Sequence, residues 1–138
     1  MRPWIFIFIG FLASSGNLQA QKQCTDSEAR SAEAEASSLS TWDALYASYR
    51  RYAQCDDAAI AEGYSATVAH LLADEWDQFD RLRQLMSSNK GFEKFVLRHI
   101  DDLMSQEQEK AIRQNASNQC PANGKSICHS IVKRLSAP

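Results

Sequence analysis

Apolar residues recur at intervals of three and four along most of this chain, from about residue 40 almost to the C-terminus. Glycine and proline are scarce, at 5 and 3 of 138 residues. Ala, Leu, Glu, Gln and Arg, which favour helices, fill the intervening positions, and β-branched residues are few. The pattern predicts an all-α protein, a compact bundle of five or six short helices joined by short connections.

Capping patterns predict where several of these helices begin. Residues 40–43 and 105–108 resemble capping boxes, in which a serine side chain accepts a hydrogen bond from the third helical amide. Asp56, Asp57 and Asn89 are favourable N-cap residues ahead of two further periodic segments. The starts of four helices are therefore predicted from short polar motifs.

The first twenty residues are typical of a secretory signal peptide. One positive charge, Arg2, precedes a nearly unbroken apolar run over residues 4–12, and small and polar residues follow. The run is much shorter than the roughly 20 residues needed to span a bilayer. We therefore expect cleavage at Ala20 or Gly16 and a mature protein that is periplasmic or secreted, without a membrane anchor.

Residues 21–38 differ in composition from the rest of the mature chain. They contain Ala, Glu and Ser but no large apolar side chain between Thr25 and Ser38. Because such a segment offers no wide apolar face, we expect a solvated or flexible N-terminal arm. Residues 39–138 are then expected to form one helical domain, since about 100 residues suit a single core.

All four cysteines lie beyond the predicted signal peptide. An even number of cysteines in an exported chain is typical of disulfides rather than of free thiols or metal ligands. Of the three possible pairings we favour Cys24 with Cys55 and Cys120 with Cys128. The first would attach the N-terminal segment to the helical domain, and the second would span the turn that starts at Pro121.

The titratable residues favour a binding protein over an enzyme. His70, His99 and His129 lie on three different predicted helices, so no metal site is expected. Cys128-His129 lacks the earlier cysteine of a c-type haem motif, because position 125 is lysine, and no cofactor is expected. No Gly-x-Ser-x-Gly nucleophile motif is present. A formal net charge of −2 without a basic stripe predicts no nucleic-acid partner.

Two aromatic segments are candidate recognition surfaces, because Tyr and Trp are enriched at binding hot spots. One is a stripe on the predicted helix that starts near residue 41, and the other follows at residues 76–79. Core packing is the alternative role of such a stripe. The candidate binding surface comprises Trp42, Tyr46, Tyr49, Arg50, Trp76 and Phe79.

The second aromatic segment also suggests an alternative function. Trp76 and Phe79 lie among Asp74, Asp77 and Asp80, and aromatic side chains among acids occur in hydrolytic and glycan-binding clefts. An envelope enzyme or glycan-processing accessory is therefore the alternative to a binding module. The same acids oppose the dipole at a helix C-terminus, so a kink or short break is expected near Asp77.

Residues 39–52, Cys55-Asp56-Asp57 and residues 60–65 resemble an uncharacterised family of small exported helical proteins of Gram-negative bacteria. The resemblance extends through residues 95–101 and Cys120-Pro121, and it implies a periplasmic location. Cys55 ahead of Gly63-Tyr64 is also similar to Rap1a/Tai-type immunity proteins, which block secreted cell-wall amidases. We therefore expect an inhibitor or immunity-type module that docks stoichiometrically onto a protein partner in the cell envelope. The partner's identity and the oligomeric state are left open.

Overall fold

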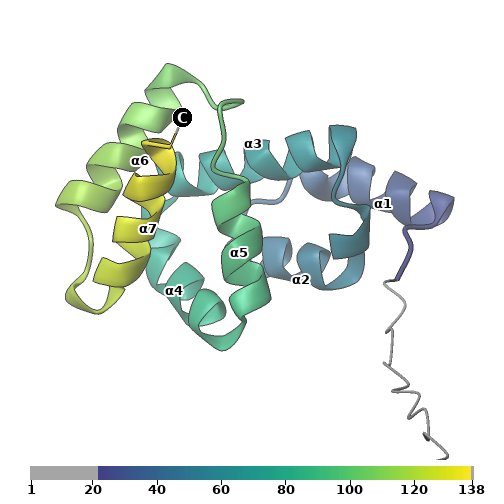
Figure 1. Cartoon of the computed structure of the whole chain (residues 1–138), viewed down its shortest axis with the longest axis horizontal. Helices are drawn as coiled ribbons and strands as arrows, with labels where there is room; N and C mark the ends of the chain where they lie inside the picture. Colours follow the sequence, from purple (N-terminus) through teal and green to yellow (C-terminus); the bar gives the residue numbers. More distant parts are fainter. Residues whose placement is uncertain (1–21, 138) are drawn as a thin grey trace, which may run out of the picture.

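The computed structural model describes residues 22–137, and these residues form helices and connections without a strand (Figure 1). The α-helices are α1 (Asp26–Ala36), α2 (Trp42–Tyr52), α3 (Ala58–Asp74), α4 (Phe79–Ser88), α5 (Lys90–Arg98), α6 (Gln106–Asn118) and α7 (Lys125–Leu135). Three short 3-10 helices connect them: η1 (Ala53–Cys55), η2 (Trp76–Gln78) and η3 (Ala122–Gly124). The predicted fold class is confirmed, with seven α-helices in the described part of the chain.

The predicted signal peptide, residues 1–20, lies outside the described residues. Within residues 22–137, none of the helices combines the length and the apolar character that crossing a membrane requires.

The long helix α3 organises the bundle. It packs against α1 towards one end and against α6 towards the other, while α7 lies alongside α6 and α4 packs on α5 (Figure 1). Asn115 of α6 is buried and donates hydrogen bonds to the backbone oxygens of Leu72 and Ala73, at 3.0 and 3.1 Å. These bonds satisfy carbonyls at the C-terminal end of α3, which have no partner within the helix.

Local sequence fixes most of the helix starts. The predicted N-cap residues are found for three helices: Asp57 for α3, Asn89 for α5 and Ser105, in a capping box with Gln108, for α6. For α2 the cap is Thr41 rather than Ser40, and the Thr41 hydroxyl accepts from the amide of Ala44 at 3.1 Å. The predicted capping box at residues 40–43 was therefore wrong by one position, since either hydroxyl could serve as the cap.

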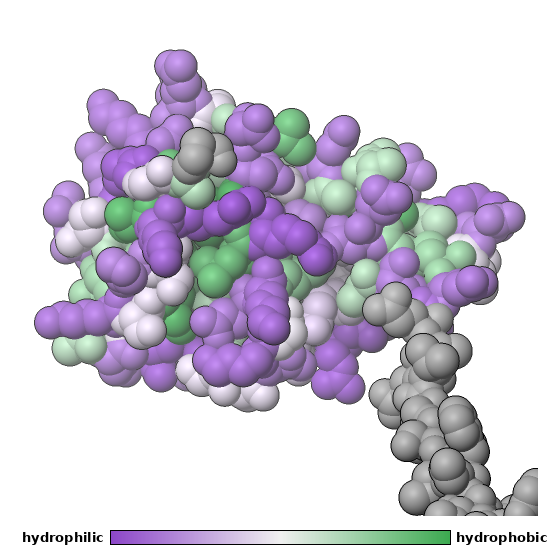
Figure 2. All heavy atoms as spheres, in the orientation of Figure 1, coloured by the Kyte–Doolittle hydropathy of each residue, from purple (hydrophilic) through white to green (hydrophobic). Residues whose placement is uncertain are grey.

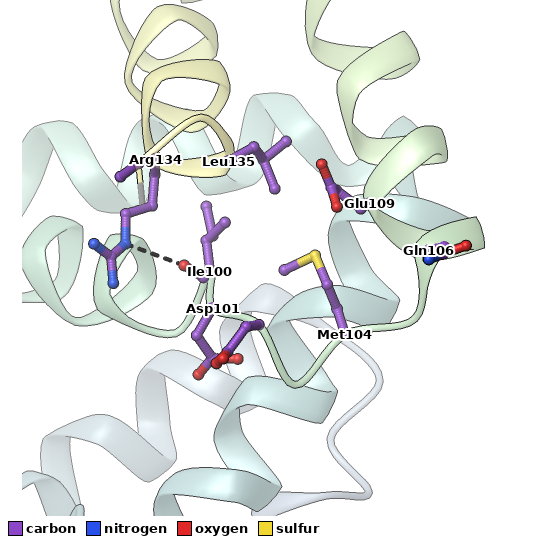
Figure 3. Close-up of a pocket in the computed structure, with 9 residues that line it drawn as sticks. Ile100, Asp101, Met104, Gln106, Glu109, Arg134 and Leu135 are labelled. Atoms are coloured by element: carbon purple, nitrogen blue, oxygen red, sulfur yellow. Dashed lines mark hydrogen bonds between the residues drawn. The ribbon is translucent and has the colours of Figure 1, made fainter.

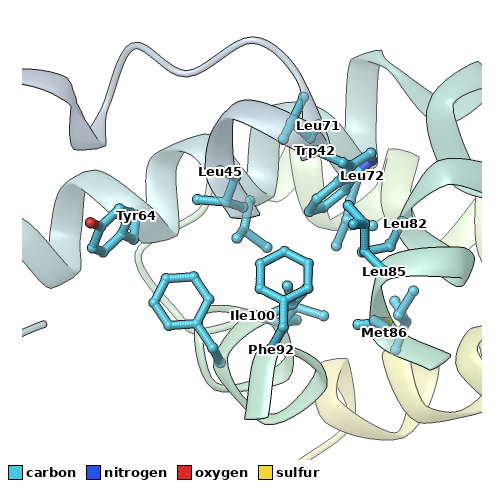
Figure 4. Packing of buried hydrophobic residues seen from close by; sticks show 14 of the residues in the cluster. Trp42, Leu45, Tyr64, Leu71, Leu72, Leu82, Leu85, Met86, Phe92 and Ile100 are labelled. Atoms are coloured by element: carbon cyan, nitrogen blue, oxygen red, sulfur yellow. The ribbon is translucent and has the colours of Figure 1, made fainter. Parts of the chain in front are cut away.

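One continuous core lies between the helices (Figure 4). Its largest fully buried side chains include Trp42, Tyr64, Phe92 and Phe95. The Tyr64 hydroxyl shares a 2.8 Å hydrogen bond with Ser48, which is also buried. The buried phenol is thus satisfied, as a polar group in an apolar core must be.

The segment predicted to be a solvated or flexible arm is a packed helix. Ala32 and Ala36 of α1 are 0% and 1% exposed, and α1 lies against α3. A Cβ atom added to Gly63 of α3 would lie 2.8 Å from the Cβ of Ala36, so the glycine permits this close approach. The expectation that this segment buries no face was wrong, because small residues on both helices replace large apolar side chains at the contact.

Both predicted disulfides are present. Cys24 is bonded to Cys55 across a separation of 31 residues, and Cys120 is bonded to Cys128 across 8 residues. The first bridge attaches the segment just before α1 to η1, and on a chain-entropy model it stabilises the fold by roughly 4 kcal/mol. Disulfides of this kind are typical of proteins in oxidising compartments.

Candidate functional site

The aromatic stripe on α2 is largely covered by the core. Trp42 is 1% exposed and therefore belongs to the core rather than to a surface. Tyr46 and Tyr49 are half-buried against Phe92 of α5, with ring centroids 5.0 and 5.4 Å from its ring. Arg50 is exposed and donates a 3.3 Å hydrogen bond to the Tyr46 hydroxyl. Only the edges of the two tyrosines and Arg50 remain at the surface.

The second predicted aromatic pair also packs internally. The rings of Trp76 and Phe79 stack with centroids 4.5 Å apart, and Phe79 is 4% exposed. The Trp76 indole N–H donates to the backbone oxygen of Gln119 at 3.2 Å. A Cβ atom on Gly124 would lie 2.5 Å from the Phe79 ring, so that ring presses against η3. Through these two contacts the Trp76–Phe79 pair packs η2 and the start of α4 against the connection between α6 and α7.

Two of the three acids near this pair, Asp74 and Asp80, each bind a side chain of their own helix. Asp74 accepts from His70 at 2.9 Å, and Asp80 accepts from Arg83 at 2.7 Å. The Arg83 hydrogen bond lowers the pKa of Asp80, whereas a catalytic general acid needs a raised pKa. In residues 22–137 no group of three His, Cys, Asp or Glu residues is placed to hold a metal ion.

A hollow of about 500 Å³ lies at the other end of the bundle (Figure 3). It is bounded by the connection between α5 and α6, which we call the 99–105 loop, by the start of α6 and by the end of α7. Figure 2 shows apolar surface among hydrophilic residues on the face formed by α5 and α7. The residues lining the hollow are Ile100, Asp101, Asp102, Met104, Gln106, Glu109, Arg134, Leu135 and Ala137.

Leu103 lies on the 99–105 loop between Asp102 and Met104, which both line this hollow. It is 61% exposed, more than any other large apolar side chain in the described part of the chain. Its spacing from Phe92 and Val96 would place it on the buried face of α5 if that helix continued to residue 103. The helix ends at Arg98, and the Asp101 carboxylate accepts from the Leu103 amide at 3.0 Å, which stabilises a turn instead of a further helical turn.

A buried polar chain fastens this loop to the core. His99 bridges two elements: its Nε2 lies 3.1 Å from Asp56 Oδ2, and its Nδ1 lies 3.0 Å from Ser65 Oγ. Ser65 in turn donates to Asp101 Oδ2 at 2.6 Å. The side chains of His99 and Asp56 are 4% and 3% exposed, and Arg98 reaches the same Asp56 oxygen from the surface.

The directions of these hydrogen bonds follow from the donors available. Ser65 has one hydroxyl proton, which it donates to Asp101, so its oxygen accepts from His99 Nδ1. An ionised Asp56 can only accept, so His99 Nε2 donates to it. The hydrogen-bonded chain therefore runs from Asp56 through His99 and Ser65 to Asp101.

Asp56 occupies an unusual position. Burial raises its pKa, but the hydrogen bond and charge of His99, together with Arg98, outweigh burial and hold the pKa of Asp56 below its usual value. Its Oδ1 atom is buried without a hydrogen-bond partner in the described structure. Two residues later, Ala58 has φ of 46°, a left-handed conformation that costs about 1–2 kcal/mol in a non-glycine residue.

The hydrogen-bonded chain of Asp56, His99, Ser65 and Asp101 contains the residue types of a Ser-His-Asp catalytic triad, but its serine is not positioned as a nucleophile. In a triad the histidine accepts the serine proton, which activates the oxygen as a nucleophile. Here Ser65 is 4% exposed and donates to Asp101. The geometry supports a structural role, and a second bond acts in the same way: Arg134 Nε donates to the Ile100 oxygen at 3.1 Å.

The sequence pattern gave little sign of this site. It placed His99 on a predicted helix and Asp56 among the helix caps, but it did not connect them, because 43 residues separate the two positions. Ser65 and Asp101 are separated by 36 residues. The one available signal was the run of acids at residues 101–109, which contains no lysine or arginine.

No family model, no curated protein and no solved structure matches this chain. The resemblances noted in the sequence therefore stay predictions, and a function has to be inferred from the geometry of the molecule.

Proposed function

We propose that this protein is a protein-binding module of the periplasm or the extracellular space, an inhibitor or immunity-type protein that acts by stoichiometric docking. The observation that carries the proposal is the solvent exposure of Leu103 on the 99–105 loop, the neighbouring residues of which line a hollow. A single exposed leucine is ordinary on a protein surface. A leucine on a loop that is already ordered by bonds to the core can bury its side chain in a partner with little loss of conformational entropy.

The fastening of the loop favours tight binding. Three hydrogen bonds hold the loop: Ser65 to the Asp101 side chain, the Leu103 amide to the same side chain, and Arg134 to the Ile100 backbone oxygen. A segment that is already ordered loses little conformational entropy when it binds. The loop therefore has the preorganisation that an inhibitory segment needs.

The charges around Leu103 indicate the chemistry of the partner. Residues 99–109 contain Asp101, Asp102, Glu107 and Glu109 and no lysine or arginine. Complementary charge increases the association rate and selects among partners. We therefore expect the partner to be a protein of the cell envelope with an apolar pocket surrounded by basic residues.

The proposed location rests on two features. The two disulfides support an oxidising compartment, and residues 1–20 have the composition of a signal peptide. The alternative function around Trp76, an envelope enzyme or glycan-processing accessory, has weaker support because Trp76 and Phe79 stack on each other and pack on neighbouring elements.

Quantitative capture from an envelope extract of the source cells tests the proposal. The exported chain, its Leu103→Asp variant and a Ser87→Asp control on the exposed side of α4 are compared. We expect the unaltered chain and the control to recover one basic protein in about equimolar amount, and Leu103→Asp to recover about tenfold less, as expected for a central contact. Recovery that does not depend on Leu103, or no partner at all, contradicts the proposal.

A further inference from the structure

The hollow beside Leu103 has an apolar floor and a charged rim. We infer that it is a binding site for a lysine side chain, the aliphatic stem of which lies on the floor and the ammonium group of which lies beside Glu109. The inference rests on the proposed function in one respect, namely that the lysine belongs to the docked protein. The site itself is argued from the hollow alone.

The size and floor of the hollow suit an aliphatic chain. Its volume of about 500 Å³ lies within the range of about 300–1,000 Å³ that is usual for ligand sites. Ile100 is 2% exposed, while Met104 and Leu135 are half-buried and line the hollow. Lysine side chains lay their methylene groups along such apolar surface and keep the charged end in water.

The charges on the rim favour a cation. Asp101, Asp102 and Glu109 line the hollow against a single Arg134. Both Asp101 oxygens are occupied by Ser65 and the Leu103 amide, but Asp102 makes no hydrogen bond or ion pair with residues 22–137. A carboxylate without a partner at the mouth of a hollow is available to an incoming ammonium group.

Glu109 is the acid best placed to meet the ammonium group. Its Oε1 accepts from Arg113 at 2.9 Å, which leaves Oε2 free of partners in the described structure. In Figure 3, Arg134 and Glu109 lie on opposite sides of the hollow, with Leu135 and Met104 between them. A cation at Glu109 Oε2 therefore lies across the hollow from Arg134, although the Arg113 guanidinium on Oε1 offsets part of the Glu109 charge.

The helix ends around the hollow add to the negative potential. Both α5 and α7 end next to it, and the C-terminal end of a helix carries partial negative charge. The N-terminus of α6 has the opposite sign, but Ser105 and Gln108 already satisfy two of its amides in a capping box. The balance of side chains and helix ends therefore favours a cation over an anion.

An NMR titration tests the site without the protein partner. The disulfide-bonded, ¹⁵N-labelled protein is titrated with Nα-acetyl-lysine amide, and separately with the norleucine and glutamate analogues. We expect the lysine compound to shift the amides of residues 100–104 and of Glu109, with a Kd on the order of 10 mM, as suits so small a ligand. The norleucine analogue has the same stem without the charge, and we expect it to bind about tenfold more weakly.

Two matched variants assign the ammonium position. Glu109→Gln is expected to weaken binding of the lysine compound by about threefold, the range of a partly exposed ion pair. Glu107→Gln lies in the same first turn of α6 but does not line the hollow, and it is expected to leave the affinity unchanged. Equal losses in the two variants mean that the effect is one of net charge and overturn the assignment.

The other outcomes are equally decisive. Equal binding of the norleucine analogue makes the site merely apolar, and tighter binding of the glutamate analogue makes it an anion site at Arg134. If the amide signals of residues 100–104 and Glu109 do not shift at the highest concentration of the lysine compound, the proposed lysine site is refuted. Because this titration uses no partner, its failure leaves the Leu103-dependent capture intact, and a failed capture leaves the site intact.

Discussion

The aromatic face of α2 and the 99–105 loop present apolar side chains in opposite ways. On α2, Trp42 is buried, while Tyr46 and Tyr49 are half-covered by α5. On the loop, Leu103 stays in water although its neighbour Ile100 is buried. Apolar packing holds the first region, whereas hydrogen bonds to buried polar groups hold the second. A segment fixed by polar bonds can leave its apolar side chain free for another molecule.

Truncating the buried end of the aromatic face gives the largest expected effect. Trp42→Ala should lower the free energy of unfolding by about 4 kcal/mol, because it removes a fully buried ring and leaves a cavity. Urea denaturation followed by circular dichroism measures the loss. A loss below about 1 kcal/mol would show that this face is not part of the cooperative core, and the contrast between the two regions would disappear.

Removing the central link of the polar chain should cost nearly as much. His99→Leu leaves the Asp56 carboxylate buried without its principal partner, and losing one member of a buried pair costs about 3 kcal/mol. The double variant His99→Leu with Asp56→Leu should recover part of that loss, because no buried charge then remains. A double variant as unstable as the sum of the two single changes would mean that the two side chains act independently.

Ser65→Ala tests whether the buried hydrogen bonds of His99, Ser65 and Asp101 order the 99–105 loop. It removes the hydroxyl between His99 and Asp101, and we expect a loss of about 1–2 kcal/mol from the unpaired groups. Hydrogen exchange should accelerate mainly at the amides of residues 100–104. If exchange there equals that of the unaltered protein, the loop is held by other contacts, and its preorganisation does not depend on the core.

The lowered pKa of Asp56 predicts an acid-sensitive contribution to stability. Because the pKa of the folded state lies below the ordinary value of 3.8, this contribution is present above that pH and is lost as the pH falls through the folded-state pKa. Unfolding measured from pH 6 down to pH 2 should therefore be less steeply pH-dependent in Asp56→Asn than in the unaltered protein. Parallel profiles would contradict a stabilising role of the ionised carboxylate.

The smallest expected effect on stability is at Leu103. Leu103→Ser should change the free energy of unfolding by less than about 0.5 kcal/mol, because the side chain contributes little to the core. Its thermal and urea unfolding should match those of the Ser87→Asp control. A larger loss would place Leu103 in the core and remove the basis for a docking role.

Much of the fold could be predicted from the sequence. The spacing of apolar residues predicted an all-α fold, and Asn89 and Ser105 marked the starts of α5 and α6. Both disulfide pairs were predicted correctly. These features depend on neighbours within a few residues, or on the few pairings that four cysteines allow.

The contacts missed by the sequence analysis depend on distant residues. The burial of α1 requires Gly63 to face Ala36, and neither residue shows this in its own segment. Leu103 continues the helical spacing of α5, so only the turn stabilised by Asp101 reveals that it points outward. The polar chain joins residues 34–43 positions apart, a distance at which local patterns carry no information.

The Cys24–Cys55 bridge has a consequence for how the protein matures. Cys55 immediately precedes Asp56, and Asp56 begins the chain of buried hydrogen bonds that leads to the 99–105 loop. Oxidation of the two cysteines therefore restrains the backbone next to the buried Asp56 carboxylate and links the segment just before α1 to η1. In a reducing compartment a newly made protein lacks the Cys24–Cys55 disulfide, so the segment before α1 is not covalently linked to η1. On the proposed function, the protein would therefore become competent to dock only after this bridge has formed in an oxidising compartment.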